Sequence, residues 1–390
     1  MSNHHVSNKA LNIEPFHVVS LITRAMELEK QGKKIVNLVV GEPEFKTPKP
    51  IIDSAIKSLE QNKIRYSPSL GKVELRESIA KWYQDREKIN LSYNKIAVTS
   101  GSSAALLLTM AVLLNPGNEV IISDPSYPCN RHFVAAMEGV ATCVPVDSKT
   151  NYQLTLEKVK DNWTEKTKAV LVSSPSNPTG GILDYEELEK IYSFVCSQGG
   201  YLIVDEIYRG ISYDKEPVSA TALGENVFVI NSFSKYFCMT GWRLGWLVAP
   251  EKFIEKIEHL AQNLYISNSD IAQDAVLSAF SPDVVSQLDS NLIHYKEQKD
   301  YLMNELLRIG FKIPVEPKGA FYIYADASNF TDDSYKFCWE ILEDIGVAIA
   351  PGLDFGNYRS NIHVRFSFPK TINIMSCLLY TSRAHETPCH

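Results

Sequence analysis

The sequence has no run of basic residues and no long apolar segment. Its 39 Lys and Arg residues are outnumbered by 46 Asp and Glu residues, giving a formal net charge of −7. This balance argues against nucleic acid or an anionic membrane surface as a partner. The longest apolar stretch, 104–114, is interrupted by Thr109 and is far shorter than the roughly 18 residues needed to cross a bilayer. We therefore expect neither a membrane span nor a nucleic-acid partner.

Patterns for metals and nucleotides are also missing. The seven cysteines form no CxxC pair, and no histidine has a spacing suited to zinc, so no metal site is expected. There is no GxxxxGK[ST] and no GxGxxG after a strand, which argues against the common nucleotide-binding loops. The first five residues are polar and lack the apolar segment of a secretory signal, so the default prediction is a cytoplasmic protein.

The length and the hydrophobic pattern predict an α/β protein with two units. A chain of 390 residues exceeds what one hydrophobic core usually serves. Helical patterns alternate with short apolar runs, which is typical of a mainly parallel sheet covered by helices. The strands are expected at 96–99, 119–123, 169–173, 201–205, 227–232 and 244–248, and the helices at 50–61, 72–87 and 102–114. A helix at 15–32 and a short strand at 34–40 precede them.

The part of the sequence after residue 250 predicts a smaller α+β unit. Residues 250–309 have helical patterns that cross to it, and it combines strands at 320–324, 347–349 and 362–368 with a helix at 333–345. We predict an N-terminal arm with part of the small domain at 1–45, a large domain at 46–285 and the small domain at 286–375. Residues 376–390 have no helical periodicity and resemble a translated sequencing adapter, so we expect a non-native tail and a missing last helix.

Polar residues follow three of the predicted strands. Asn177 follows the strand at 169–173, Asp205 and Tyr208 follow the apolar run at 201–204, and Lys235 follows the run at 227–231. Ligands of open parallel sheets bind beyond the carboxyl ends of the strands. We therefore expect these side chains to share one edge of the sheet.

Lys235 is the most informative of these residues. An amine screened by apolar neighbours loses part of its preference for the charged form, which makes it available as a Schiff-base nucleophile. Pyridoxal phosphate is the common cofactor that supplies an aldehyde for such an amine. Asp205 could pair with its protonated ring nitrogen, while Tyr208 and Asn177 could contact the ring oxygen. Alternatively, Asp205 is a helix cap and 177–180 is only a turn. The order of all these residues along the chain favours the cofactor site.

The phosphate of such a cofactor requires donors. Gly101, Ser102 and Ser103 lie between a strand and an apolar helix, where backbone N–H groups form an anion site. On its own this pattern is more often a simple helix cap. Arg243 adds a guanidinium suited to phosphate. Other predicted cofactor contacts are the hydroxyls of Ser232 and Ser234 and the ring of Tyr127, which could stack on a flat ring although a lone tyrosine is more often core.

Taken together and in order, the motifs resemble those of class I aminotransferases of the fold type I pyridoxal phosphate enzymes, over about residues 10–370. The matching segments are GEPEF at 41–45, YSPSLG at 66–71 with LR at 75–76, the turn at Gly101, SNPTG at 176–180, DEIY at 205–208, the Lys235 segment, GAFY at 319–322 and VRFS at 364–367. Glu44 departs from the pattern, in which Asp is usual. The resemblance implies a large domain with a seven-stranded sheet and a small domain built from both chain ends.

The resemblance also implies roles that the residues alone do not give. Arg365 corresponds to the arginine that binds the substrate α-carboxylate in a bidentate manner, and Gly41 to a backbone contact with the same group. Tyr66 corresponds to a tyrosine that reaches the neighbouring subunit's cofactor, which implies a homodimer with shared active sites. Without the resemblance, Arg365 would be interpreted as a surface charge and Tyr66 as core. Ser103 stands where part of the family has a lysine for a distal carboxylate, which disfavours aspartate or glutamate as substrates.

The activity that follows is ping-pong transfer of an amino group between an L-amino acid and a 2-oxo acid through a Lys235 Schiff base. Lys235, Asp205 and Tyr208 are the predicted catalytic residues. The alternative is a carbon–sulfur β-lyase, because removal of the Cα proton is common to both reactions on this scaffold. A transcription regulator built on the same fold is disfavoured, because the resemblance begins within about the first ten residues and leaves no room for a preceding DNA-binding domain.

Overall fold

A seven-stranded sheet forms the centre of the larger part of the molecule. The computed structural model describes residues 6–11 and 13–370. The strand order is β2-β8-β7-β6-β5-β3-β4, and only β8 runs antiparallel to its neighbours. The strands are β2 (Ile96–Thr99), β3 (Glu119–Asp124), β4 (Val140–Pro145), β5 (Thr167–Ser173), β6 (Tyr201–Asp205), β7 (Val227–Ser232) and β8 (Gly245–Val248). This arrangement confirms the predicted α/β class and the mainly parallel sheet.

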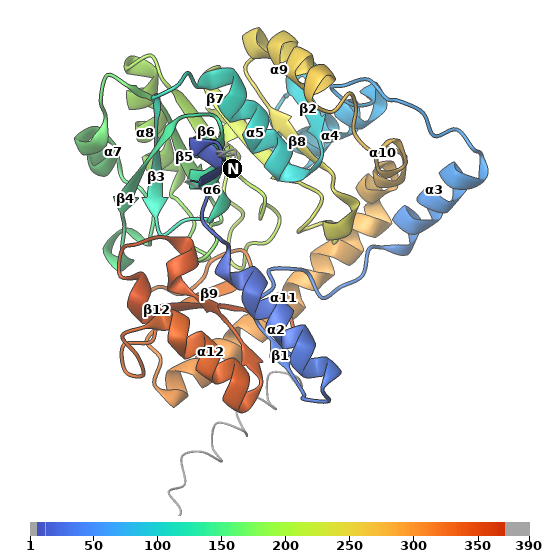
Figure 1. The fold of residues 1–390 in the computed structure, drawn as a ribbon. Helices are drawn as coiled ribbons and strands as arrows, with labels where there is room; N and C mark the ends of the chain where they lie inside the picture. Colours follow the sequence, from blue (N-terminus) through green and yellow to red (C-terminus); the bar gives the residue numbers. More distant parts are fainter. Residues whose placement is uncertain (1–5, 12, 371–390) are drawn as a thin grey trace, which may run out of the picture.

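Both faces of this sheet are buried. Successive residues of β3 point to opposite faces, so Ile121 enters one apolar core while Val120 and Ile122 enter another. Helix α5 packs on β7 and β8, and α8 packs on β6. The helices of this part are α3 (Lys49–Glu60), α4 (Val73–Glu87), α5 (Gly101–Leu113), α6 (Cys129–Ala136), α7 (Leu156–Asn162), α8 (Tyr185–Ser197), α9 (Glu251–Leu264) and α10 (Asp270–Val276). Figure 1 shows most of these helices around the sheet, whereas α3 projects away from it and packs on α10.

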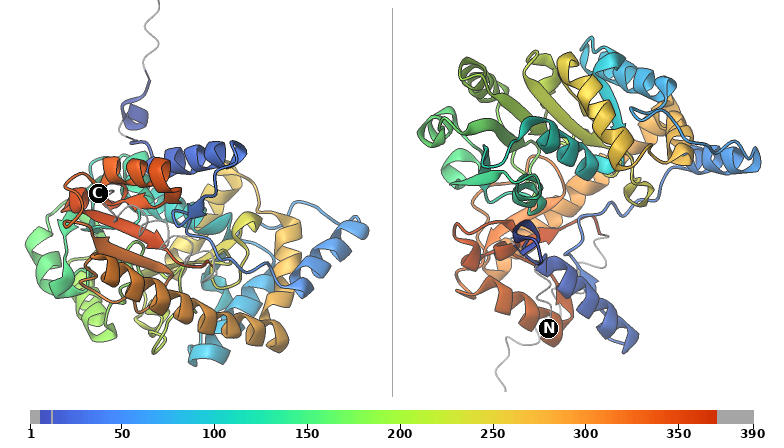
Figure 2. Two further views of the ribbon diagram at one scale, coloured as in Figure 1. Left: turned by 90° about the horizontal axis from the view of Figure 1, so that it is seen from below. Right: turned by 45° about the horizontal axis from the view of Figure 1, so that its top comes forward.

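The smaller part joins the two ends of the described chain. Three antiparallel strands lie in the order β11-β12-β9, and β1 near the N-terminus pairs in parallel with β10. The long helix α11 connects this part to the larger one (Figures 1 and 2). The elements are α1 (Asn8–Leu11), α2 (His17–Lys30), β1 (Val36–Asn37), α11 (Pro282–Ile309), β9 (Tyr322–Asp326), α12 (Ser334–Ile345), β10 (Val347–Ala348), β11 (Ala350–Pro351) and β12 (His363–Ser367). A small unit built from both chain ends was expected.

Several predicted elements need correction. The single strand expected at 347–349 is two short strands, β10 and β11, and the strand expected at 34–40 is only β1. Strand β4 and helices α6, α7 and α8 were not predicted. The predicted domain limits at 45, 285 and 375 remain predictions, and the proposed tail at 376–390 lies outside the described residues.

Within residues 6–11 and 13–370, no helix has the length and apolarity needed to cross a membrane. The same residues contain no group of three or more His, Cys, Asp and Glu side chains placed to hold a metal ion.

Candidate active site

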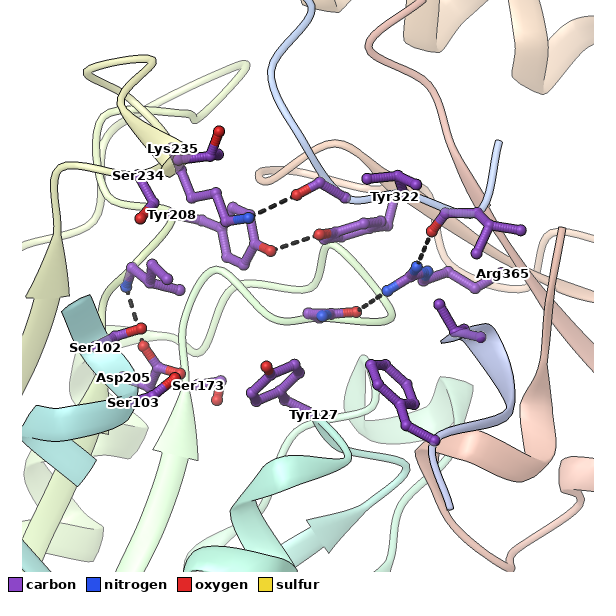
Figure 3. A pocket seen from close by; sticks show the side chains of 18 of the residues that line it. Ser102, Ser103, Tyr127, Ser173, Asp205, Tyr208, Ser234, Lys235, Tyr322 and Arg365 are labelled. Carbon is purple, nitrogen blue, oxygen red and sulfur yellow. Dashed lines mark hydrogen bonds between the residues drawn. The ribbon is translucent and has the colours of Figure 1, made fainter. Parts of the chain in front are cut away.

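A cavity of about 290 Å³ collects most of the predicted site residues. This volume is at the small end of ligand pockets, which span roughly 300–1,000 Å³. The predicted residues that line it are Gly41, Ser102, Ser103, Tyr127, Asn177, Asp205, Tyr208, Ser234, Lys235, Arg243 and Arg365. They come from distant parts of the sequence and face one space (Figure 3). Gly101, Ser232 and Tyr66 were predicted for the site but do not belong to the lining.

Lys235 contributes an amine to the lining of this cavity. Lys235 follows β7 in a stretch without regular structure, and its Nζ donates a hydrogen bond to the carbonyl of Gly41 at 2.6 Å. Burial is the main cause that lowers its pKa to about 8, while the nearby Glu42 raises it and the positive charges of Arg365 and Arg243 lower it. At neutral pH a fraction of this amine is therefore neutral and can act as a nucleophile.

Asp205 ends β6 and is buried. Its Oδ1 accepts a hydrogen bond from the backbone N–H of Ile207 at 3.1 Å. Burial raises the pKa of this carboxyl to about 6, against the opposing effects of that hydrogen bond and of the charge of Lys235. An ionised carboxylate has more acceptor sites than this one bond uses, so a cationic N–H group in the cavity would find a partner here.

Tyr208 is paired with a second tyrosine that the sequence did not single out. The hydroxyls of Tyr208 and Tyr322 are 2.5 Å apart, and burial raises the pKa of both. Tyr322 also explains the glycine at position 41, because a Cβ there would lie only 1.9 Å from the Tyr322 hydroxyl. Gly41 therefore permits a close approach of the N-terminal segment to β9.

Arg365 lies on β12 and is 3% exposed. Its Nη1 donates to Oδ1 of Asn177 at 2.9 Å and its Nη2 to the carbonyl of Val39 at 2.5 Å, whereas its buried Nε has no partner. The guanidinium lies over the rings of Tyr322 and Phe355, at 4.4 and 4.8 Å from their centres. These contacts hold the guanidinium in one orientation. Gly41 lines the same cavity, and its contact with the substrate carboxylate remains a prediction.

Groups that can bind an anion gather at the N-terminus of α5. Ser102 and Ser103 lie in the first turn of this helix, where backbone N–H groups lack intrahelical partners. Gly101 has φ +78°, and a Cβ at this position would come within 2.6 Å of Nη2 of Arg243, so the glycine lets the guanidinium approach the helix end. Ser234 completes this group in the cavity lining.

Ser232 has a supporting position instead of the predicted contact. Its hydroxyl has two possible acceptors for its one proton, Oγ of Ser234 at 2.9 Å and the carbonyl of Leu244 at 3.1 Å, and it accepts from the backbone N–H of Ser234 at 3.1 Å. These bonds keep Ser232 out of the lining and fix the position of Ser234.

The cavity fits pyridoxal phosphate by the chemistry of its groups. Hydroxyls, free helix N–H groups and a guanidinium at one end suit a phosphate, a buried carboxylate suits a ring nitrogen, and Lys235 supplies an amine for an aldehyde. Ser173, at the end of β5, also lines the cavity, and its buried Oγ has no partner within the described chain. An unpaired buried hydroxyl is costly, and a polar ligand would satisfy it. The end of the predicted strand at 169–173 was the available signal for this residue.

Tyr66 lies apart from this cavity. It belongs to the connection between α3 and α4 and is 82% exposed. Tyr66 therefore does not line the cavity of its own chain.

Known proteins with similar sequences cover nearly the whole chain. A family model described as class I and II aminotransferases matches residues 33–373. A valine–pyruvate aminotransferase of Mycobacterium tuberculosis is 37% identical over 358 residues, which are 91% of this chain and 92% of that protein. A (5-formylfuran-3-yl)methyl phosphate transaminase of Methanocaldococcus jannaschii is 36% identical over 93% of this chain and 94% of that protein.

Solved structures agree with the sequence relatives. An aminotransferase from Mycobacterium tuberculosis has a TM-score of 0.94 at 35% identity, covering 98% of this chain and 99% of that one. An aspartate aminotransferase from Thermotoga maritima has a TM-score of 0.90 at 32% identity, covering 97% and 99%. These similarities extend over both parts of the fold.

Proposed function

The chain belongs to the class I and II aminotransferases, and on that premise we propose that Lys235, Asp205 and Arg365 carry its reaction. The protein is an aminotransferase that depends on pyridoxal phosphate. The observation that supports the residue assignment is the meeting of an amine, a buried carboxylate and a buried guanidinium in one cavity. Bound pyridoxal phosphate supplies an aldehyde that bonds to amines and a ring that withdraws electrons from the substrate α-carbon.

The residues around the cavity would bind and orient this cofactor. The α5 N-terminus, with Ser102 and Ser103, would hold the phosphate together with Ser234 and Arg243. Tyr127 would stack on the ring. Asp205 would keep a proton on the ring nitrogen, and Tyr208 would donate to the ring oxygen, with its own hydroxyl positioned by Tyr322.

Lys235 and Arg365 would act on the substrate. Arg365, oriented by Asn177 and Val39, would bind the α-carboxylate and place the Cα–H bond near Nζ of Lys235. The neutral amine of Lys235 would then take the proton from Cα and deliver it to the cofactor's aldehyde carbon. The first substrate leaves its amino group in the site and gains the oxygen of water as it departs as a 2-oxo acid. A second 2-oxo acid takes the amino group and gives up its own carbonyl oxygen as water.

The proposed function is tested by whether the amino group passes to an acceptor and is not released as ammonia. We expect the holoenzyme, given L-valine and isotopically labelled pyruvate, to form labelled alanine and no ammonia; the name of the M. tuberculosis relative suggests this pair as the first choice, before a wider set of amino acids. Mass spectrometry and an ammonia assay give both readouts. Pyruvate and ammonia formed from cysteine without any acceptor would instead establish the β-lyase, which none of the named relatives supports.

The buried carboxylate of Asp205 has a consequence for stability without cofactor. Its pKa is raised from about 4 to about 6, so between these values the unfolded chain loses a proton that the folded chain keeps, and stability falls as pH rises. A shift of about two pKa units corresponds to roughly 3 kcal/mol. We expect cofactor-free Asp205→Asn to gain stability over the wild type between pH 4 and pH 6, by up to this order, and to keep that gain at pH 8.

Urea unfolding of both cofactor-free proteins at pH 4.5, 6 and 8 measures this difference. The exposed Asp161 provides the control, because Asp161→Asn should leave the pH dependence unchanged. If the difference in unfolding free energy between Asp205→Asn and wild type were the same at all three pH values, burial of the Asp205 carboxylate would not destabilise the cofactor-free fold.

We also propose that the enzyme is a homodimer in which Tyr66 reaches the phosphate in the partner's site. Its 82% exposure supports this role. Losing a hydrogen bond to a charged group costs about 1.5–3 kcal/mol, so Tyr66→Phe should weaken cofactor affinity about 10- to 150-fold. Sedimentation measures the oligomeric state, and cofactor titration measures the affinity. Tyr185→Phe, on α8, is the control and should leave the affinity unchanged. A monomeric holoenzyme whose affinity is unchanged by Tyr66→Phe would refute the shared site. A cytoplasmic location remains a prediction from the sequence.

A further inference from the structure

One wall of the cavity is formed by α2, and it is apolar. The α2 wall, as we call it, consists of Phe16, Val18, Val19 and Ile22. Val18 and Val19 precede Ile22 by four and three residues, so the three side chains share one face of the helix. Phe16, immediately before the helix, extends the same surface. These side chains can offer a ligand van der Waals contact and no hydrogen bond.

The α2 wall is continuous with the hydrophobic core, because Val18 belongs to that core and Phe16 and Ile22 pack against it. Leu21 and Leu28 of α2 are fully buried, and the helix packs on α12, β10 and β11. Val19, in contrast, is 54% exposed. An amphipathic helix of a globular protein usually has one apolar stripe. Val19 is the wall residue left exposed beside the cavity, and this exposure is explained if part of the ligand covers it.

The α2 wall is anchored across the fold. The carboxylate of Asp354, 2% exposed, accepts hydrogen bonds from the backbone N–H groups of His17 at 2.9 Å and Val18 at 2.8 Å. The residue at the N-cap position of α2, Phe16, provides no side-chain cap. Asp354 therefore fulfils the capping role from a distant segment and fixes the first turn of the helix beside the cavity.

The charges of the cavity leave no cation for this region. Among the described residues, the charged side chains of the lining are those of Asp205, Lys235, Arg243 and Arg365. The proposed function assigns Arg243 to the phosphate, Arg365 to the α-carboxylate and Lys235 to proton transfer. Glu42 lies close enough to Lys235 to affect its pKa and adds negative charge.

Two further arginines near the α2 wall are already paired. Arg24 of α2 contacts Glu343 and Glu27, at 2.5 and 3.0 Å. Arg131 of α6 contacts Glu14 at 3.3 Å, and neither arginine lines the cavity. A second carboxylate on a substrate would therefore enter an apolar region in which its own chain offers no free cation, and the burial of an unpaired charge is strongly unfavourable.

We propose that the substrates of this enzyme carry an apolar, uncharged side chain that packs on the α2 wall, and that dicarboxylic amino acids are disfavoured. The proposal rests on the proposed function and specifies its substrate class. Transfer of an aliphatic side chain from water to an apolar surface favours binding by about ten- to a hundredfold. In the first half of the reaction, an amino acid gives its amino group to the bound cofactor. We expect valine and leucine to react in this step at least about tenfold faster than aspartate and glutamate.

The test follows the absorbance of the bound cofactor after mixing the holoenzyme with each of twenty amino acids. A parallel calorimetric titration compares two unreactive carboxylates, 4-methylpentanoate and butanedioate, and reports binding alone. The first is expected to bind at least about tenfold more tightly. Aspartate or glutamate reacting as well as leucine, or butanedioate binding as tightly as 4-methylpentanoate, would overturn the substrate class while leaving the transaminase intact. A holoenzyme that reacts with none of the twenty would overturn the proposed function itself.

A charge on the α2 wall provides the second arm. Val19→Lys places a cation at an exposed position of the wall, so the protein should fold normally. We expect it to shift the ratio of aspartate to leucine reactivity at least about tenfold toward aspartate. Met26→Lys adds the same charge to the same helix at a position that is 53% exposed and not part of the lining, and it should leave the ratio unchanged within about twofold. Equal shifts in both variants would show a general charge effect and would overturn the role of the wall.

Discussion

Lys235→Ala should abolish multiple-turnover transamination, with a loss of at least about 10⁴-fold. General acid–base catalysis by a positioned side chain contributes about 10²- to 10⁴-fold, and this variant loses the covalent attachment of the cofactor as well. The buried amine, with a pKa lowered to about 8 and its Nζ 2.6 Å from the carbonyl of Gly41, is the only described amine in the cavity lining. No other side chain there can replace it.

A labelling experiment and a matched control variant test whether Lys235 itself carries the cofactor. Borohydride reduction followed by peptide mass spectrometry should attach the cofactor to Lys235 in the wild type and to no residue in Lys235→Ala. The exposed Lys256, on α9, supplies a control in which Lys256→Ala retains both activity and attachment. Multiple turnovers by Lys235→Ala at even one hundredth of the wild-type rate would refute the assignment of this lysine.

Arg365→Lys is expected to raise KM for the amino acid far more than it lowers kcat. The guanidinium is held by Asn177 and the Val39 carbonyl, and a lysine ammonium cannot reproduce its planar, bidentate geometry. Truncating one partner of a buried, hydrogen-bonded charge pair costs about 2–5 kcal/mol. At 1.4 kcal/mol for each factor of ten, the expected increase in KM is about 30- to several thousandfold.

Steady-state kinetics with the best amino acid of the half-reaction screen check this prediction. Arg359 is half-exposed and pairs with Asp326 at 3.2 Å near the same sheet, so Arg359→Lys tests the loss of an arginine outside the cavity. An Arg365→Lys enzyme with KM within about threefold of the wild type would place the substrate carboxylate elsewhere.

Burial on both sheet faces explains which strands were predictable. β2, β6 and β7 coincide with the predicted ranges 96–99, 201–205 and 227–232, because strands covered by helices on both faces are continuous apolar runs. β2 and β4 are both edge strands, but all residues of β2 are buried, whereas most residues of β4 are only partly buried or exposed. The β4 sequence therefore lacks the apolar run that identified the others.

The sequence predicts which residues meet in the site where each follows a strand of the large sheet. It does not predict the contacts formed where the two ends of the chain meet. Asn177, Asp205 and Lys235 each follow a strand, and the structure brings them into one cavity. The contact between Arg365 and Val39 joins residues 326 positions apart, and no local pattern encodes such a pairing. Ser232 was assigned to the phosphate because hydroxyls at 232 and 234 are equivalent in the sequence. Only the backbone path shows that one of them faces Leu244 and the other the cavity.

The pairing of both chain ends also has a consequence for synthesis on the ribosome. Strand β1 needs β10, α2 needs Asp354, and Val39 needs Arg365, whereas every strand of the seven-stranded sheet lies between residues 96 and 248. Translation at about 5–20 residues per second separates Val39 from Arg365 by roughly 15–65 s. During that time the large sheet can assemble while the N-terminal segment has no partner, so a nascent chain can hold the lysine and the phosphate groups in place long before it can bind a substrate carboxylate.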